Sequence, residues 1–188
     1  MNLKVLIIAG AMLFIPTANA AFIASVGFAP FGGDNLVQTT EEDLEAGTGL
    51  YGDLGFLLRP ASSAISYQAT IGLKANAVDF DGGDADIVSL PMNMMIFYNN
   101  ASNLRFGIGA TYELGPEFTF NAPPGFSDRS VEFDDALGFA IEVGYFLNEK
   151  AFLGARYTAL DYEVSPNQST AETVIDANNL GIHIGIMF

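Results

Sequence analysis

The sequence predicts an all-β protein: an eight-stranded antiparallel up-and-down transmembrane β-barrel, with short turns at one end and long loops at the other. Three observations predict this fold. Half of the 188 residues are hydrophobic although the formal net charge is −15. The hydrophobic residues alternate with small or polar ones over eight segments, which is the period of a β-strand. The connections between these segments alternate between short and long, as in a chain of hairpins.

Residues 1–20 have the three parts of a secretory signal peptide. Lys4 supplies a positive charge, residues 5–15 are apolar and uncharged, and Ala18-Asn19-Ala20 has the small-x-small pattern of a cleavage site. The alternative is a membrane anchor, but the apolar stretch is too short to cross roughly 30 Å of hydrocarbon. We therefore expect residues 1–20 to be removed and residues 21–188 to form one barrel domain.

The first four expected strands cover 22–29, 50–58, 65–74 and 88–98. Each places large apolar side chains on one face and small or polar ones on the other. Pro91 interrupts the fourth segment, so it must lie where the ladder needs no N–H donor. The hydrophobic pattern therefore has period two in this half of the chain.

The last four expected strands cover 104–114, 137–145, 152–159 and 180–188, and two of them alternate without exception. The apolar face of the last strand carries Leu180, Ile182, Ile184, Ile186 and Phe188. Its other face carries Gly181, His183, Gly185 and Met187.

The connections follow a regular order along the chain. The short ones are 59–63, 99–102 and 147–150, and the long ones are about 30–47, 75–86, 115–131 and 163–173. Because short and long connections interleave, each pair of strands is a hairpin and the long loops all lie at the same end of the barrel.

The sizes of the alternating residues distinguish a membrane barrel from a soluble one. A soluble barrel points its bulky apolar residues inward, whereas here the opposite face is too rich in glycine to cover a surface. In a bilayer the large residues face lipid, and the small and polar residues fill a narrow interior. An aromatic girdle is expected at the short-turn end, from Phe22, Phe56, Tyr67, Tyr98, Phe106, Tyr145 and Phe188.

The charged residues separate into a loop set and an interior set. Eighteen of the 22 acidic residues fall in or beside the long loops, where Arg129 is the only basic residue. The interior set is balanced and consists of Asp53, Lys74, Arg105, Glu113, Glu142 and Arg156. Unpaired charges in a narrow lumen would be costly, so we expect these six to form an ion-pair network that plugs the barrel. The alternative is a narrow or gated pore whose ion pairs rearrange.

One acidic loop has a spacing loosely similar to that of a calcium loop. Asp79, Asp81, Asp84 and Asp86 place oxygen ligands beside glycines, which would suit weakly bound calcium or magnesium. The alternative is a solvated loop, and we expect no other cofactor. Divalent cations would also let the acidic loops approach the phosphates of lipopolysaccharide.

Two segments carry a resemblance to a known family. Phe-Leu-Gly-Ala-Arg-Tyr at 152–157 and the alternating segment that ends at Phe188 resemble the small outer-membrane β-barrel proteins, including the OmpA-type transmembrane domain. The resemblance implies the outer membrane of a Gram-negative bacterium, with both termini in the periplasm. It also implies that the barrel assembly machinery reads Phe188.

The composition and the motifs exclude several functions. The acidic balance argues against nucleic acid as a partner. Deacylase relatives of the family use a His-x-Ser pair, whereas Ile184 and Gly185 follow His183, so lipid A modification is the weakest alternative and no enzyme is expected. The expected protein is a monomer in contact with lipid and lipopolysaccharide, with a structural or surface-interaction role. A pore is the second hypothesis, and the ligand of the loops stays open.

Overall fold

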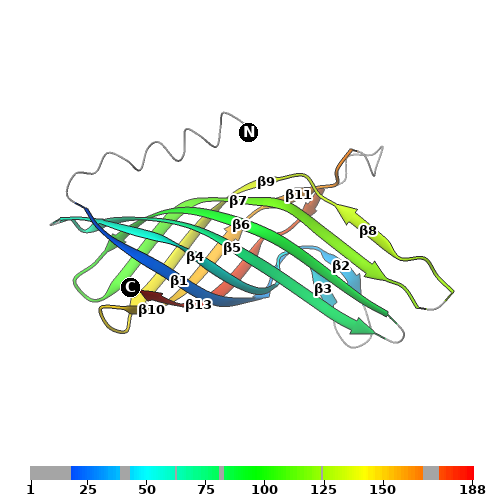
Figure 1. Ribbon diagram of the computed structural model, residues 1–188, viewed down its shortest axis with the longest axis horizontal. Coiled ribbons are helices and arrows are strands. Elements are labelled where there is room, and N and C mark those ends of the chain that lie inside the picture. The colour runs from blue at the N-terminus through cyan, green and yellow to red at the C-terminus, as the bar shows by residue number, and fades with distance from the viewer. Residues whose placement is uncertain (1–17, 39–42, 62, 81–82, 124, 167–173) are drawn as a thin grey trace.

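The protein is a closed barrel of eight antiparallel strands (Figure 1). The computed structural model describes residues 18–38, 43–61, 63–80, 83–123, 125–166 and 174–188. Pairing of the first strand with the last closes the ring, since Ile23 lies opposite Met187 and Phe28 opposite Ile182. The barrel strands are β1 (Ala18–Phe31), β4 (Gly49–Pro60), β5 (Ile65–Phe80), β6 (Gly83–Asn99), β7 (Leu104–Asn121), β9 (Ala136–Phe146), β10 (Ala151–Ala159) and β13 (Asn179–Met187). The predicted fold class is confirmed.

Among the described residues, five short strands lie in the long connections. They are β2 (Asn35–Gln38), β3 (Asp43–Glu45), β8 (Arg129–Glu132), β11 (Asp161–Glu163) and β12 (Val174–Asp176). β2 pairs with β3, β11 pairs with β12, and β8 adds to the edge of β7. Within the described ranges, no helix is long and apolar enough to cross a membrane.

The two faces of each strand have the predicted orientation. Most of the large apolar residues point outward, with Ile108 66%, Leu137 72% and Ile182 61% exposed. The residues between them point inward and are mostly buried. The outer wall is therefore an apolar band, which is the reverse of a soluble barrel.

The seven aromatic residues expected in a girdle are all exposed near the short-turn ends of their strands. The ring of Phe22 lies 5.7 Å from that of Phe56 and 6.2 Å from that of Phe188, so three of them are neighbours around the β1 seam. Phe188 also donates its backbone N–H to Phe22 O at 2.9 Å. The C-terminus and the first described residues of β1 thus share the short-turn end (Figure 1).

The prediction of a long loop over residues 75–86 is wrong. β5 continues to Phe80 and β6 begins at Gly83, so residues 75–80 and 83–86 are paired as the loop-end part of a hairpin. β7 likewise runs on to Asn121, into the third expected loop. The alternation continues through these residues, because Val78, Ala85 and Ile87 are buried on the inner side. A sheet of β5, β6, β7 and β8 therefore extends beyond the rest of the barrel (Figure 1).

Apolar side chains close both ends of the interior. At the loop end, the cap consists of Leu44, Ala46, Val78, Ala85, Ile87, Phe133, Ala136, Leu160, Tyr162 and Ala177. At the short-turn end, the turn-end cluster consists of Ile23, Leu57, Phe152 and Met187. The connections supply much of the cap, so they fold inward over the mouth instead of standing free in solvent.

The predicted signal peptide lies mostly outside the described residues, which begin at Ala18. Ala18 and Asn19 continue β1 and lie opposite Pro60 and Arg59. Cleavage after Ala20 would shorten β1 by three residues and leave its pairing with β13 intact, because that pairing begins at Ile23. The cleavage stays a prediction.

Candidate functional site in the barrel interior

All six residues expected in the interior point into the lumen. Their exposed fractions are at most 7%. They come from five strands: Asp53 from β4, Lys74 from β5, Arg105 and Glu113 from β7, Glu142 from β9 and Arg156 from β10. Strand alternation alone turns each of them inward.

Glu142 is the centre of the group of ions nearer the short-turn end of the interior. Its Oε1 accepts a hydrogen bond from Arg105 Nη2 at 2.6 Å, and its Oε2 accepts one from Arg156 Nε at 3.0 Å. His183 Nε2 lies 3.4 Å from Oε1. The carboxylate thus compensates two guanidinium groups, and Arg156 Nη1 extends the group to Asp53 Oδ2 at 3.5 Å.

Arg105 is held by aromatic rings as well as by charge. Its guanidinium lies 3.7 Å from the centroid of the Phe97 ring and 4.0 Å from that of Phe152. It also donates to Gln68 Oε1 at 3.1 Å. Cation–π contacts of a desolvated guanidinium are stronger than exposed ones. Sequence reasoning assigned Arg105 to the inner face but did not identify its contacts, because the partners come from four different strands.

Nearer the loop end, a second group of ions contacts Tyr162 of the cap. Lys74 Nζ lies 3.9 Å from Glu113 Oε1, and the Tyr162 hydroxyl donates to Glu113 Oε2 at 2.5 Å. Burial and the nearby Glu113 carboxylate hold the pKa of Tyr162 well above its usual range, so the phenol remains a donor. Tyr162 lies between the expected strand 152–159 and the expected loop 163–173, where no periodic pattern marked it as interior.

Little open space remains between the two groups of ions. A cavity of about 30 Å³ is lined by Asp53, Lys74, Glu113 and Arg156, together with six neutral residues. That volume holds about two water molecules, since each needs roughly 10–15 Å³. The described interior therefore consists of the cap, two ion-pair groups around a small cavity, and the turn-end cluster.

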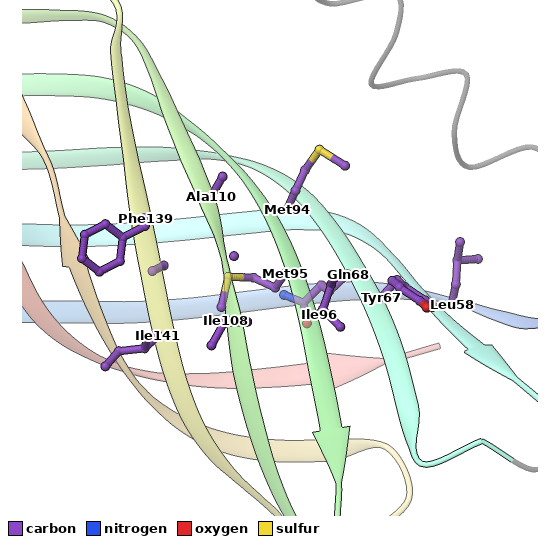
Figure 2. A pocket seen from close by; sticks show the side chains of 12 residues that line it. Leu58, Tyr67, Gln68, Met94, Met95, Ile96, Ile108, Ala110, Phe139 and Ile141 are labelled. Atoms are coloured by element: carbon purple, nitrogen blue, oxygen red, sulfur yellow. The ribbon is translucent and has the colours of Figure 1, made fainter.

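A large hollow lies on the outer wall and not in the lumen. Its volume is about 850 Å³, and Figure 2 shows its lining from β4, β5, β6, β7 and β9. The exposed part is apolar: Met94, Ile96, Ile108, Phe139 and Ile141 surround the small Ala110. It lies within the apolar band, so it is a depression in the surface that a bilayer would cover.

The predicted cation ligands lie on the extended sheet, with one exception. Asp79 lies opposite Asp84 across the hairpin, and Asp86 is two residues further along the same face. Asp81 lies outside the described residues. In the part of the chain that the structure describes, no group of three His, Cys, Asp or Glu residues is placed to hold a metal ion. A weak calcium or magnesium site here stays a prediction.

Acidic residues crowd the outer face of the extended sheet. Glu117 lies opposite Glu132 in the register of β7 and β8, and both lie on the side of Asp84 and Asp86. Burial raises the pKa of Asp86, and the negative charges of Asp84 and Glu117 raise it further. Like charges at facing positions of a sheet destabilise it.

We expect the extended sheet to become more stable as the pH falls from 7 toward the ordinary pKa of aspartate, about 4. An acid whose pKa is higher in the folded than in the unfolded chain binds more protons when folded, so the free energy of unfolding rises as the pH falls through the folded pKa. Exchange of the β6 amides 83–88, corrected for intrinsic rates, should show a gain of roughly 0.5 kcal/mol. Asp86→Asn should reduce this gain and Asp43→Asn should not, whereas equal protection at both pH values would contradict it.

Solved structures share this architecture across nearly the whole chain. Neisserial surface protein A matches with a TM-score of 0.57 at 15% identity, over 91% of this chain and 99% of the other. Ail, the attachment invasion locus protein of Yersinia pestis, matches with a TM-score of 0.57 at 8% identity, over 92% and 99%. The outer membrane protein OprG from Pseudomonas aeruginosa matches with a TM-score of 0.51 at 19% identity, over 92% and 97%. The chain has the fold of the small outer-membrane β-barrels.

This likeness is one of fold. No family model matches the chain, and no curated protein matches it by sequence. The neighbours agree with the resemblance found in the sequence, and they support a transmembrane barrel. What any of them binds does not carry over at identities this low.

Proposed function

We propose that this protein is an integral outer-membrane barrel with a closed lumen, which acts through its structure and its acidic loop end and not as a pore. The apolar band would face lipid, and the short-turn end with Phe188 would lie in the periplasm. The acidic loop end would then face outward, where divalent cations could bridge it to lipopolysaccharide phosphates. A single chain already closes the ring, which supports a monomer.

The filled lumen carries the proposal. Three carboxylates and three basic side chains occupy the interior and are at most 7% exposed, with only a cavity of about 30 Å³ among them. An eight-stranded barrel has space for its own side chains and little else. The cap and the turn-end cluster add apolar barriers at the two ends.

Paired charges in the lumen also make the plug hard to open. The Glu142 carboxylate contacts both Arg105 and Arg156, so movement of one side chain would leave a buried charge without compensation. Breaking a buried ion pair costs about 3–5 kcal/mol, which keeps the open population small. The same charges make the interior too polar to serve as an apolar ligand pocket.

Planar-bilayer recording tests the closed lumen. The purified protein should add no steady conductance to the membrane, while a porin reconstituted in parallel should give clear steps. A stable open level would contradict the proposal and favour the narrow pore. If that current also changed with Lys74→Gln and not with Lys150→Gln, the ions would pass through the lumen, because Lys150 lies in an exposed turn.

A further inference from the structure

The barrel wall splits between β9 and β10 near the loop end. The two strands are paired as far as Phe139 and Ala159. Nearer the loop end, the residues before β9 contact β11 and the residue after it. Asp134 N donates to Glu163 O at 2.9 Å, and Phe133 forms an isolated β-bridge with Val164. Between the two contacts lies a hollow of about 530 Å³.

This hollow, called the wall split below, has an acidic half and an apolar half. The acidic half contains Asp134, Asp135, Asp161 and Glu163, and no Lys or Arg is among the described residues that line it. The apolar half contains Leu137 and Phe139, which are 72% and 58% exposed on the outer wall. A Cβ at Gly138 would collide with the Ala159 carbonyl oxygen, so the two strands lie close together where the hollow ends.

Two of the four carboxylates have side-chain or backbone partners among the described residues, and the other two have none there. Asp135 accepts from the Tyr112 hydroxyl at 2.8 Å and from Gly115 N at 3.0 Å, and Asp134 accepts from the Ser165 hydroxyl at 2.6 Å. Within the described segments, no side-chain partner is found for Asp161 or Glu163. These two exposed carboxylates are therefore available to a positive group.

The backbone of β11 also presents polar groups to the wall split. Leu160 O accepts a hydrogen bond from Ala177 N, so residue 160 faces β12 and β13. Because successive residues of an antiparallel strand point their N–H and C=O groups to opposite edges, those of Asp161 point toward β9. The Asp161 carbonyl oxygen is therefore a further acceptor in the acidic half, next to the apolar half.

We propose that the wall split binds an amphiphile with a protonated amine head and an alkyl tail, taken from the surrounding membrane. The amine would donate to the carboxylates of Asp161 and Glu163 and to the Asp161 carbonyl, while the tail would lie along Leu137 and Phe139. Charge complementarity selects this class, since an anionic head would be repelled by four carboxylates. This binding site goes beyond the proposed function. It rests on the apolar outer wall facing lipid and does not depend on whether the lumen is closed.

Amide chemical shifts in neutral maltoside micelles provide the test, with dodecylamine as the probe. Saturable shifts should be largest for residues 134–139 and 159–163. Dodecanol, which has the tail without the charge, and methylammonium, which has the charge without the tail, should each bind at least tenfold more weakly. Shifts spread evenly over all acidic segments, or equal binding of methylammonium or calcium, would overturn the proposal.

Matched charge variants separate this site from general attraction to an acidic protein. Asp161→Asn with Glu163→Gln should weaken dodecylamine binding at least tenfold. Asp79→Asn with Asp86→Asn removes two charges from the extended sheet and should change it less than twofold. Equal losses in the two double variants would show general attraction only. Both should keep the heat-dependent gel mobility of a folded barrel, and the binding result is independent of bilayer conductance.

Discussion

Replacing Glu142 with alanine is expected to lower the free energy of unfolding by about 3–5 kcal/mol. The carboxylate is 2% exposed and lies within hydrogen-bond distance of both Arg105 and Arg156. Its loss leaves two buried guanidinium groups, of which Arg156 keeps only the longer contact with Asp53 at 3.5 Å. The rings of Phe97 and Phe152 retain Arg105 sterically but do not neutralise it.

Urea unfolding of the barrel in lipid vesicles measures this effect. Glu142→Gln should have an intermediate loss, because the amide oxygen still accepts a hydrogen bond while the charge is gone. Glu149→Ala removes the same charge from an exposed turn and should alter the free energy of unfolding by less than about 0.5 kcal/mol. Equal stability of Glu142→Ala and Glu149→Ala would mean that the interior ions do not stabilise the barrel.

Replacing Gly185 with valine is expected to prevent most of the chain from folding into a closed barrel. A Cβ at Gly185 would collide with the Phe152 ring, which is fully buried. Phe152 has no space to move away, because it lies against the Arg105 guanidinium on one side and contacts His183. Overpacking of such a core costs about 1–3 kcal/mol or more, and here the clash lies between paired residues of β10 and β13.

The yield of heat-modifiable barrel after refolding into micelles measures this outcome. Gly52→Ala is the matched control, since a Cβ there meets only Ser25 O at an ordinary 3.7 Å. It should refold like the unmodified chain. A normal yield for Gly185→Val would show that the lumen around Phe152 is looser than the structure describes.

The alternation of side chains identified most of the barrel in advance. Period two fixes which residues share a face, and the sizes on the two faces distinguish a lipid-facing wall from a soluble surface. Each of the six charged residues was therefore assigned to the interior from its own strand. Pro91, which interrupts the fourth expected strand, is buried among the inward-facing residues of β6.

The partners of those residues could not be read from the sequence. Arg156 reaches Asp53, which is 103 residues away, and Arg105 reaches Gln68 across 37 residues. Such contacts cross the lumen, so they depend on the strand register and tilt that barrel closure sets. A one-residue change in register would leave each strand's pattern recognisable and would change every partner.

The connections differ most from the sequence-based expectation. Residues 75–86 were expected to form a long loop between two strands, yet residues 75–80 and 83–86 extend a hairpin whose inner face packs into the cap. Tyr162 lies in a long connection but reaches Glu113 inside the barrel. The polar residues of a connection indicate that one of its faces is exposed to solvent. Which residues pack against its other face depends on segments that are distant in the chain.

The sequence by itself determined that this chain is an outward-apolar barrel and which charged residues lie inside it, because strand alternation is a local property of the backbone. The tertiary structure decided which charges meet, how the connections cover the mouth and where the wall splits. Those features arise when β1 and β13 close the ring, since only closure brings residues from opposite strands within contact distance.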